Sequence, residues 1–272
     1  MMISNRTPVI ERVEGRTMAV NSYLVEGPDG VVVVDAQLTV DDAARVRAAV
    51  DRGGRPLAGV LITHPHPDHY AGLAAITEGL DVPIVSTAAV DQVIRRDDAL
   101  KNQVVGPMMG DQWPAQRPFP TRIVHDGESV ELGGLTFTVR DLGAGESHAD
   151  AVWALDDVTL FTGDVVYNDM HAFLADGHHG SWIEQLDELH RTLPDDVVLH
   201  VGHGAPGGKE LFVEQRRYVE AFVDAVRATA DRDEESRTKE VTAAMHRLVP
   251  HDKLLFLMQL SIEPVLTAIR GE

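Results

Sequence analysis

The sequence predicts an α/β fold, because segments with strand character alternate with segments of helical spacing along most of the chain. The chain has 272 residues, of which 44% are hydrophobic, enough for one large domain or two layers around a shared core. The order of elements (strands, helices, strands, helices) also indicates two similar halves.

The first half is predicted to begin with strands over 18–26 and 31–36, joined by Gly-Pro-Asp-Gly turn chemistry. Asp35 ends the second strand and either lies near a ligand-binding edge or caps the turn. Residues 40–51 have helical spacing and acidic residues in the first turn, and two glycines stop the helix. The elements expected next are a buried strand over 59–62, a helix over 70–77, a strand over 83–86 and a helix over 88–100.

Residues 102–121 interrupt this alternation, because prolines and glycines punctuate them, and they are predicted to form a long loop. Such a loop inside a domain is often a lid or a binding loop, and we favour that interpretation. The alternative is a loop whose apolar residues pin it to the domain surface. In the first case an apolar pocket wall would be formed by Met108, Met109, Trp113 and Phe119.

The second half begins with alternating residues over 122–140, which predict a meander around two glycine turns. A glycine-rich loop then ends at His148, and the later elements are strands over 151–155, 159–162 and 197–201 and a helix over 181–191. Three helices are predicted at the end, over 209–230, 234–248 and 254–269. The last of them is apolar on more than one face, so it packs on the sheet or at a subunit interface.

The chain is strongly acidic, with 43 acidic residues, 24 basic residues and a net charge of −19. Because such a field repels phosphate backbones, nucleic acid is a poor partner. There is no cysteine, so a metal site would use histidine and aspartate. Residues 1–6 carry no apolar core of signal-peptide length, and no apolar stretch approaches membrane-spanning length, so we expect a cytoplasmic protein without membrane contact.

Residues 64–69 read His-Pro-His-Pro-Asp-His and directly follow an apolar run. A buried strand and a proline-stiffened turn would deliver their side chains to the C-terminal edge of a sheet, where α/β proteins usually bind ligands. Imidazole and carboxylate suit divalent transition metals, zinc above all. Four such side chains are too many for one tetrahedral ion with an open position, so two ions are the simpler interpretation.

Three further ligand-type residues, His148, Asp164 and His203, close predicted strand edges or glycine-rich turns. Glycine lets the backbone approach closely at such positions. If these loops emerge at the same edge as residues 64–69, their separation in sequence no longer matters.

Together these seven residues resemble the metallo-β-lactamase superfamily of metallohydrolases, over roughly residues 18–205. The resemblance implies a four-layer αββα sandwich, in which two mixed sheets are flanked by helices. It implies a catalytic domain over residues 1–208, while 209–272 form a C-terminal helical extension, packed on the same domain or at a subunit interface.

The resemblance also implies the ligand sets of two zinc ions, with iron or manganese as alternatives. One ion would be bound by His64, His66 and His148, and the second by Asp68, His69 and His203. Asp164 would bridge both ions.

The chemistry implied is hydrolysis by a hydroxide held between two ions, because metal binding lowers the pKa of water to near 7. Asp68 is the candidate for handling the proton of the nucleophile or leaving group. Tyr167 resembles the tyrosine that polarises the substrate carbonyl in acyl-homoserine lactonases of this superfamily; the alternative is a core aromatic just past the strand.

We therefore expect a hydrolase for a small ester, lactone or thioester. Asp164 argues against β-lactam cleavage as the main role, since the true β-lactamases lack a bridging carboxylate there. A β-lactam or phosphodiester hydrolase remains an alternative, as does a non-catalytic metal-binding interaction protein, and the C-terminal helices are candidates for a homo-oligomer contact. Three other histidines either line the pocket or, as we favour, are solvated loop residues: His171, His178 and His179.

Overall fold

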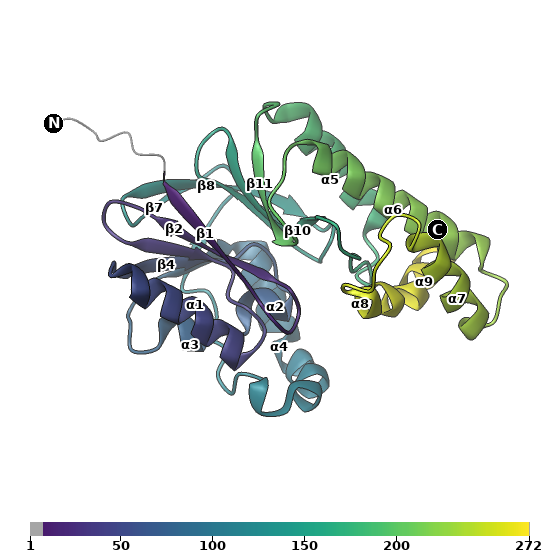
Figure 1. Cartoon of the computed structure of the whole chain (residues 1–272), viewed down its shortest axis with the longest axis horizontal. Coiled ribbons are helices and arrows are strands. Elements are labelled where there is room, and N and C mark those ends of the chain that lie inside the picture. The colour runs from purple at the N-terminus through teal and green to yellow at the C-terminus, as the bar shows by residue number, and fades with distance from the viewer. Residues whose placement is uncertain (1–7, 272) are drawn as a thin grey trace. The chain divides into compact units, whose positions relative to one another are not determined.

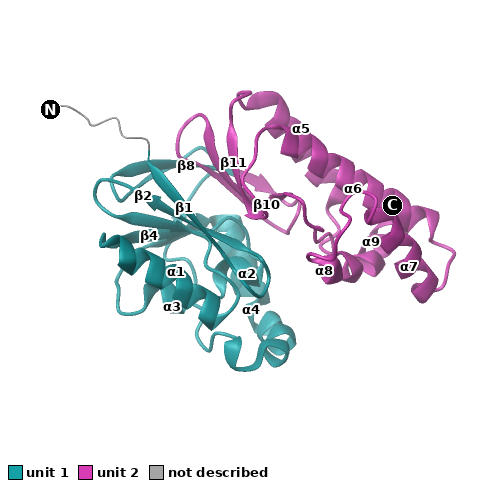
Figure 2. Cartoon of the chain, in the orientation of Figure 1, with its two compact units in different colours: residues 1–140 teal, residues 141–272 magenta. Residues whose placement is uncertain are grey.

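A computed structural model describes residues 8–271 and divides the chain into two compact units, up to Arg140 and from Asp141 (Figure 2). Residues 1–6, on which the expectation about a signal peptide rests, lie outside the described range. Over the described residues, none of the helices has the length and apolar character needed to cross a membrane.

The first unit contains a six-stranded mixed sheet, in the order β1-β2-β3-β4-β5-β6 (Figure 1). Neighbours are antiparallel from β1 to β3 and parallel from β3 to β6. All four residues of β3 are buried, as expected for a central strand covered on both faces. The strands are β1 (Val9–Glu14), β2 (Asn21–Glu26), β3 (Val31–Val34), β4 (Leu57–Leu61), β5 (Ile84–Thr87) and β6 (Arg122–Val124). Of these, β1 was not predicted.

Local sequence signals determine where the helices of this unit begin and end. The side chain of Thr39 accepts a hydrogen bond from Asp42 at the start of α1, and Gly54 ends that helix in the left-handed conformation. Thr87 caps α4 in the same way as Thr39 caps α1. The helices are α1 (Val40–Gly53), α2 (Pro67–Tyr70), α3 (Leu73–Thr77) and α4 (Ala88–Met109). The single helix expected over 70–77 is therefore wrong, because the chain breaks between α2 and α3.

The prediction of a loop over 102–121 is wrong for its first part, since α4 continues to Met109 with Pro107 inside it, followed by a 3-10 turn over Gly110–Gln112. Pro107 has no N–H to donate within α4, and the helix ends two residues later, at Met109. Trp113 is buried, donates to Asn102 of α4 at 2.8 Å and lies beneath Arg117. This anchoring favours the pinned alternative at Trp113, and the lid function stays a prediction.

The predicted meander over 122–140 is correct only in part. Strand β6 pairs parallel with β5, whereas β7 (Ser129–Leu132) and β8 (Leu135–Gly143) form an antiparallel hairpin. Gly133 and Gly134 both have positive φ, as a two-residue hairpin turn requires. After β6 the chain leaves the first sheet, and β7 and β8 belong to the second. Alternation of polar and apolar residues predicts strands but does not show which sheet each strand joins.

The second sheet is mixed and has five strands, in the order β11-β10-β9-β8-β7. Strand β9 (Asp150–Ala154) is antiparallel to β10 (Thr159–Tyr167), and β11 (Val198–His203) is parallel to β10. Strand β10 runs five residues past its predicted end at 162, with register shifts around Gly163, whose φ is 53°. Asp164 and Tyr167 therefore lie within a strand.

The helices of the second unit pack around α6, which contacts α5, α7, α9 and β10. Trp182 of α5 donates to the Val165 carbonyl of β10 at 2.9 Å. The predicted last helix is two helices that meet at Ser261, whose hydroxyl accepts from the Leu174 amide and donates to the Leu257 carbonyl. The helices are α5 (His179–Thr192), α6 (Glu210–Ala228), α7 (Glu234–Met245), α8 (Leu255–Leu260) and α9 (Ile262–Gly271).

The predicted architecture of two mixed sheets flanked by helices, with helices at the C-terminus, is confirmed. The compact units divide near residue 140, and the boundary between a catalytic domain over 1–208 and an extension over 209–272 stays a prediction.

Candidate metal centre

The first group of candidate ligands lies in the turn after β4, in the first unit. The strand ends at Leu61, and residues 64–69 follow at its carboxyl end, where α2 starts with Pro67. The neighbouring parallel strand β3 ends beside it, so the amide of Asp35 donates to the Leu61 carbonyl at 2.9 Å. Parallel strands place their carboxyl ends at one edge, which is why Asp35 and the histidines meet.

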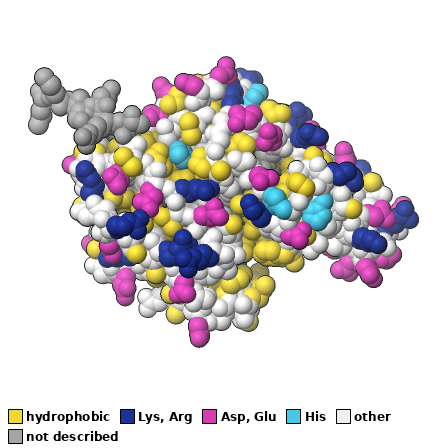
Figure 3. All heavy atoms as spheres, in the orientation of Figure 1, with side chains coloured by type: hydrophobic (Ala, Val, Ile, Leu, Met, Phe, Trp, Pro, Cys, Tyr) yellow, Lys and Arg dark blue, Asp and Glu magenta, His cyan; other side chains and the backbone are white. Residues whose placement is uncertain are grey.

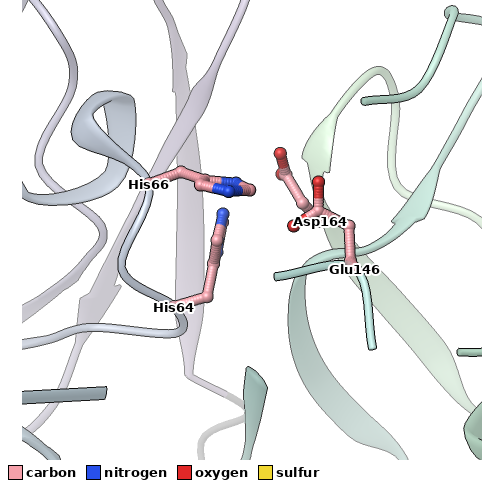
Figure 4. Close-up of side chains that lie close together, drawn as sticks. All are labelled: His64, His66, Glu146 and Asp164. Atoms are coloured by element: carbon pink, nitrogen blue, oxygen red, sulfur yellow. The ribbon is translucent and has the colours of Figure 1, made fainter. Parts of the chain in front are cut away.

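Three imidazoles converge in this turn. The ring of His64 lies 4.8 Å from that of His66 and 4.1 Å from that of His69, measured between centroids. His64 and His69 are buried, and Asp68 is 8% exposed. Figure 4 shows His64 and His66 projecting from the turn with their ring nitrogens close together. The structure thus brings together the four predicted ligands of this segment.

Hydrogen bonds fix which ring nitrogen each buried histidine presents. Asp35 accepts from Nδ1 of His69 at 2.8 Å. The Thr63 hydroxyl donates to the same Asp35 oxygen, Oδ2, at 2.8 Å and lies 3.0 Å from Nδ1 of His64. Because that hydroxyl has one proton, it accepts from His64. Both histidines are thereby set to present Nε2 as a ligand atom, an arrangement typical of metal-binding histidines.

Asp35 supports the turn, which confirms the interpretation that placed it near the ligand-binding edge. Its φ of 62° is unusual for a residue other than glycine, and its side chain is 3% exposed. It accepts hydrogen bonds from the Thr63 amide, the Thr63 hydroxyl and His69. These contacts hold a strained backbone in place.

Helix α4 fastens the turn from outside. Lys101 donates to the Pro65 carbonyl at 2.7 Å, and the Tyr70 hydroxyl donates to Asp98 at 3.0 Å. Arg117 forms an ion pair with the same Asp98. Burial, helped by the nearby Asp98 carboxylate, raises the pKa of Tyr70, so the phenol stays protonated and keeps donating. A turn fixed in this way holds its ligand atoms in place before any ion binds.

A second group of candidate ligands lies in the second unit, on the parallel strands β10 and β11. Asp164 is on β10, and His203 is the last residue of β11. Nε2 of His203 lies 3.2 Å from Oδ2 of Asp164, and both side chains are buried. The unexpected length of β10 is what carries Asp164 and Tyr167 alongside the end of β11.

Tyr167 is buried between these groups. Its hydroxyl lies 2.7 Å from Oδ2 of Asp164 and 2.9 Å from Oε1 of Glu146, and its ring stacks on His203 at 5.2 Å. The hydroxyl has one proton, so it donates to one carboxylate at a time, and it lies within hydrogen-bond distance of both. The structure places the predicted catalytic tyrosine beside Asp164, and its role toward a substrate stays a prediction.

Glu146 is a candidate ligand that the sequence analysis missed. It lies in the loop between β8 and β9, is 1% exposed and has a carboxylate oxygen within 4.8 Å of one of Asp164. Figure 4 shows the two carboxylates side by side. The sequence signal for Glu146 is an acidic residue directly after Gly143-Ala144-Gly145, but the prediction chose the histidine two positions later as the ligand.

The structure places His148 differently from Glu146. Its side chain is 37% exposed, its Nδ1 lies 2.8 Å from Nε2 of His178, and its Nε2 lies 3.8 Å from Asp176. Burial and the neighbouring His148 lower the pKa of His178. The assignment of His148 as a metal ligand stays a prediction.

The interpretation of three solvated loop histidines is wrong for His171 and His179. His171 is fully buried, with Nδ1 at 2.9 Å from the Tyr218 hydroxyl and Nε2 at 3.0 Å from the His251 carbonyl. His179 begins α5 and is 8% exposed, and His178 precedes it at the cap position. Sequence reasoning missed the burial of His171 because its partners lie on α6 and in the segment after α7, far along the chain.

Each of the two groups of side chains offers donors that fit divalent transition ions. Each supplies buried imidazole nitrogen and carboxylate oxygen, the donor types that zinc, iron and manganese accept. The hydrogen bonds from Asp35 and Thr63 also orient the imidazoles as metal binding requires.

Sequence comparison identifies related proteins. Two hydroxyacylglutathione hydrolases are similar to this chain: one from Rhodopseudomonas palustris strain BisB18 is 28% identical over 182 residues, 66% of this chain and 61% of that protein. The other, from Bdellovibrio bacteriovorus, is 26% identical over 178 residues, 61% of each protein. The chain thus matches about three fifths of the length of these relatives.

Solved structures share the fold. A beta-lactamase domain protein from Burkholderia ambifaria superposes with a TM-score of 0.70 at 20% identity, covering 97% of this chain and 87% of that one. A metallo-beta-lactamase family protein from Thermus thermophilus gives 0.71 at 19% identity, covering 97% and 93%. At these identities the likeness shows the αββα fold alone. The family model of the metallo-beta-lactamase superfamily matches residues 15–203, well over half of the sequence, and the chain belongs to that superfamily.

Proposed function

We propose that this protein is a dinuclear metal-dependent hydrolase that cleaves a small ester, lactone or thioester. The observation that carries the proposal is the preset donor geometry of residues 64–69, in which Asp35 and Thr63 fix the ligand nitrogens of two histidines. Histidines that bind metal ions are typically oriented in this way, through a hydrogen bond at the other ring nitrogen. Membership of the superfamily supports the same reaction class.

The proposed centre divides the ligands between two ions. His64 and His66 bind the first ion, together with a third ligand from the loop between β8 and β9. Asp68, His69 and His203 bind the second, and Asp164 is shared. The donor types of two groups of side chains support this division: His64, His66, Glu146 and Asp164, and Asp68, His69, Asp164 and His203. Zinc is the proposed metal, with iron or manganese as alternatives.

Such ions, when bound, lower the pKa of water to about 7 and polarise the scissile bond. The residues of the chain then have separate roles. Asp68 moves the proton of the nucleophile to the leaving group, which its position at the first turn of α2 among the histidines supports. Tyr167 orients Asp164 through its hydroxyl and is the proposed contact of the substrate carbonyl.

Among the three substrate classes we favour a thioester. The curated relatives are called hydroxyacylglutathione hydrolases, a name that describes cleavage of an acyl-glutathione. The substrate is a small molecule and not a nucleic acid, given the net charge of −19. We propose the cytoplasm as its compartment, and the C-terminal helices as the surface of a homo-oligomer.

Metal analysis of the purified chain, combined with a hydrolysis panel, tests this function. The panel contains a thioester, a lactone, nitrocefin and bis-nitrophenyl phosphate. We expect two equivalents of metal, turnover of the thioester or lactone, loss of turnover with a chelator and recovery on metal addition. Two equivalents without turnover of any substrate would favour a metal-binding interaction protein.

A double replacement, Asp164→Asn with His203→Ala, tests the dinuclear mechanism. Turnover should fall to background while circular dichroism shows a folded protein. Turnover that survives both changes would refute a mechanism that needs both ions.

A further inference from the structure

The loop between β8 and β9 offers two candidates for the third ligand of the first ion, Glu146 and His148. Hydrogen bonds inside the loop determine the direction of each side chain. The Ser147 hydroxyl donates to Asp150 at 2.6 Å, and the Gly145 amide donates to the Ser147 carbonyl at 2.9 Å. The loop is held from α5 by Gln185, which donates to the Leu142 and Ala144 carbonyls. These hydrogen bonds, made by Gly145, Ser147 and Gln185, hold the loop on both sides of residue 146.

The two side chains leave this fixed loop into different environments. Glu146 is 1% exposed, whereas the side chain of His148 is 37% exposed. The ring of His148 faces two groups of its own unit, His178 at 2.8 Å and Asp176 at 3.8 Å. A buried and an exposed candidate therefore stand two residues apart.

Glu146 reaches the part of the candidate centre that lies in its own unit. Its Oε1 lies 2.9 Å from the Tyr167 hydroxyl, which lies 2.7 Å from Oδ2 of Asp164, and a ligand oxygen of each carboxylate lies within 4.8 Å of the other. Two buried carboxylates at this separation repel each other, and burial makes the repulsion stronger. A divalent cation between them offsets both the repulsion and the loss of hydration. The grouping of Glu146 and Asp164 with His64 and His66 adds the nitrogen donors typical of a metal site.

We propose that Glu146, and not His148, is the loop's ligand to the first ion. The inference rests on the proposed dinuclear centre and deepens it. His64, His66, Glu146 and Asp164 then give that ion two nitrogen-donor and two carboxylate residues. Compared with a site of three histidines, this set carries one more negative charge and a harder donor. It therefore shifts metal preference from zinc toward manganese or iron.

Calorimetric titration of the metal-free, full-length chain with Zn²⁺ and with Mn²⁺ tests the proposal without relying on activity. Glu146→Gln removes the charge and keeps the shape, and His148→Gln is its matched control. We expect Glu146→Gln to raise the Kd of one ion by about 100-fold, since even the partners of ligands change affinity by about 10–100-fold. His148→Gln should leave both dissociation constants within about twofold of the wild-type values.

Two further variants separate ligation from support of Tyr167. Tyr167→Phe removes the hydroxyl that Glu146 contacts; equal Kd changes in Tyr167→Phe and Glu146→Gln would make Glu146 a positioning residue and overturn the proposal. Glu146→His should retain zinc binding but lower the affinity for Mn²⁺ relative to Zn²⁺ by about tenfold or more. The ratio of the Mn²⁺ and Zn²⁺ affinities of Glu146→His shows whether residue 146 is a ligand even if Glu146→Gln does not fold without metal.

The outcomes distinguish this inference from the proposed function. One outcome would overturn the inference and leave the dinuclear hydrolase standing. In it the wild-type chain binds two ions, His148→Gln loses affinity for one of them, and Glu146→Gln binds both as tightly as wild type. A wild-type chain that binds fewer than two ions would refute the dinuclear centre. If one ion still binds, its Kd in Glu146→Gln and in His148→Gln would still show which of the two residues is a ligand.

Discussion

At the scale of single residues, Asp35 shows how one carboxylate can organise a site without binding substrate. It accepts three hydrogen bonds, including one from Nδ1 of His69, and it is almost fully buried. A carboxylate behind a ligand histidine fixes the tautomer and the orientation of the ring and raises its basicity.

Asp35→Ala should therefore weaken metal binding by about 10–100-fold, because His69 loses the partner of its Nδ1. The measurement is the Kd from calorimetric titration of the metal-free chain. Asp81→Ala, at an exposed aspartate of the same unit, is the control and should change nothing. An Asp35→Ala chain that is folded and binds metal as tightly as wild type would contradict the role given to Asp35.

Tyr167→Phe should slow ester, lactone or thioester cleavage by about tenfold or more, because a hydrogen bond to a charged group contributes about 1.5–3 kcal/mol. The measurement is kcat and KM on the best substrate of the panel. Tyr23→Phe, at a buried tyrosine of β2, is the matched control. An unchanged rate in Tyr167→Phe would show that Tyr167 is a buried aromatic residue without a role in catalysis.

At the scale of elements, the site depends on short, constrained connections. The turn after β4 feeds α2 within a few residues, and the break between α2 and α3 falls at Gly72. The Gly72 amide donates to the Gln37 carbonyl at 2.9 Å, so this break lies directly against the chain that follows β3. A Cβ on Gly72 would lie 2.1 Å from the Ala36 carbonyl oxygen and 2.7 Å from Cβ of Ala43.

Gly72→Ala should destabilise the protein by about 1–3 kcal/mol, because the added methyl forces the backbone after β3 away from α2 and α3. The measurement is the free energy of unfolding in urea. Gly53→Ala is the control: its Cβ would meet nothing closer than 3.8 Å, and alanine favours the helix by about 0.5–1 kcal/mol. Equal stability of the two variants would contradict the close approach at Gly72.

At the scale of the whole molecule, the chain carries a large acidic excess, with 43 acidic and 24 basic residues. Figure 3 shows basic side chains interspersed among the acidic ones on the face that it draws. The charge of −19 therefore acts on solubility and long-range partner choice. Two buried histidines, His171 and His200, contribute to the pH response of folding.

Burial lowers the pKa of His171 from its ordinary value of 6.5 to about 4; the His251 carbonyl and Asp252 oppose this shift, and His246 and His251 add to it. Between these pH values the unfolded chain binds a proton that the folded chain does not, so stability rises with pH across the window and falls on acidification. Burial lowers the pKa of His200 to about 4 as well, so that histidine adds in the same direction.

His171→Gln should reduce the difference in unfolding free energy between pH 6.5 and pH 4.5, because glutamine does not titrate and can still bond to the Tyr218 hydroxyl. Urea unfolding of the metal-free chain at both pH values measures it. The exposed His125→Gln is the control and should keep the wild-type difference. An undiminished difference in His171→Gln would show that His171 is not a source of the acid sensitivity.

Features of the fold that depend on neighbouring residues can be predicted from the sequence, whereas features that depend on contacts between distant parts of the chain cannot. Alternating patterns and turn residues identify most strands and helices, since these signals lie within a few neighbouring positions. They do not identify the extension of α4 through Pro107. Nor do they identify the break within the last predicted helix, where the Ser261 hydroxyl bonds to the Leu174 amide, 87 residues away in sequence.

The sequence by itself determined the superfamily and the ligand-rich turn over 64–69, because covalent connection alone keeps four ligand side chains within six positions. Only the tertiary structure decided that β10 carries Asp164 and Tyr167 alongside His203, that Asp35 and Thr63 orient the histidines, and that Glu146 is buried while His148 is exposed. The direction of a loop side chain is set by hydrogen bonds such as that from Ser147 to Asp150 and by strands paired across large sequence distances, and no local pattern encodes them.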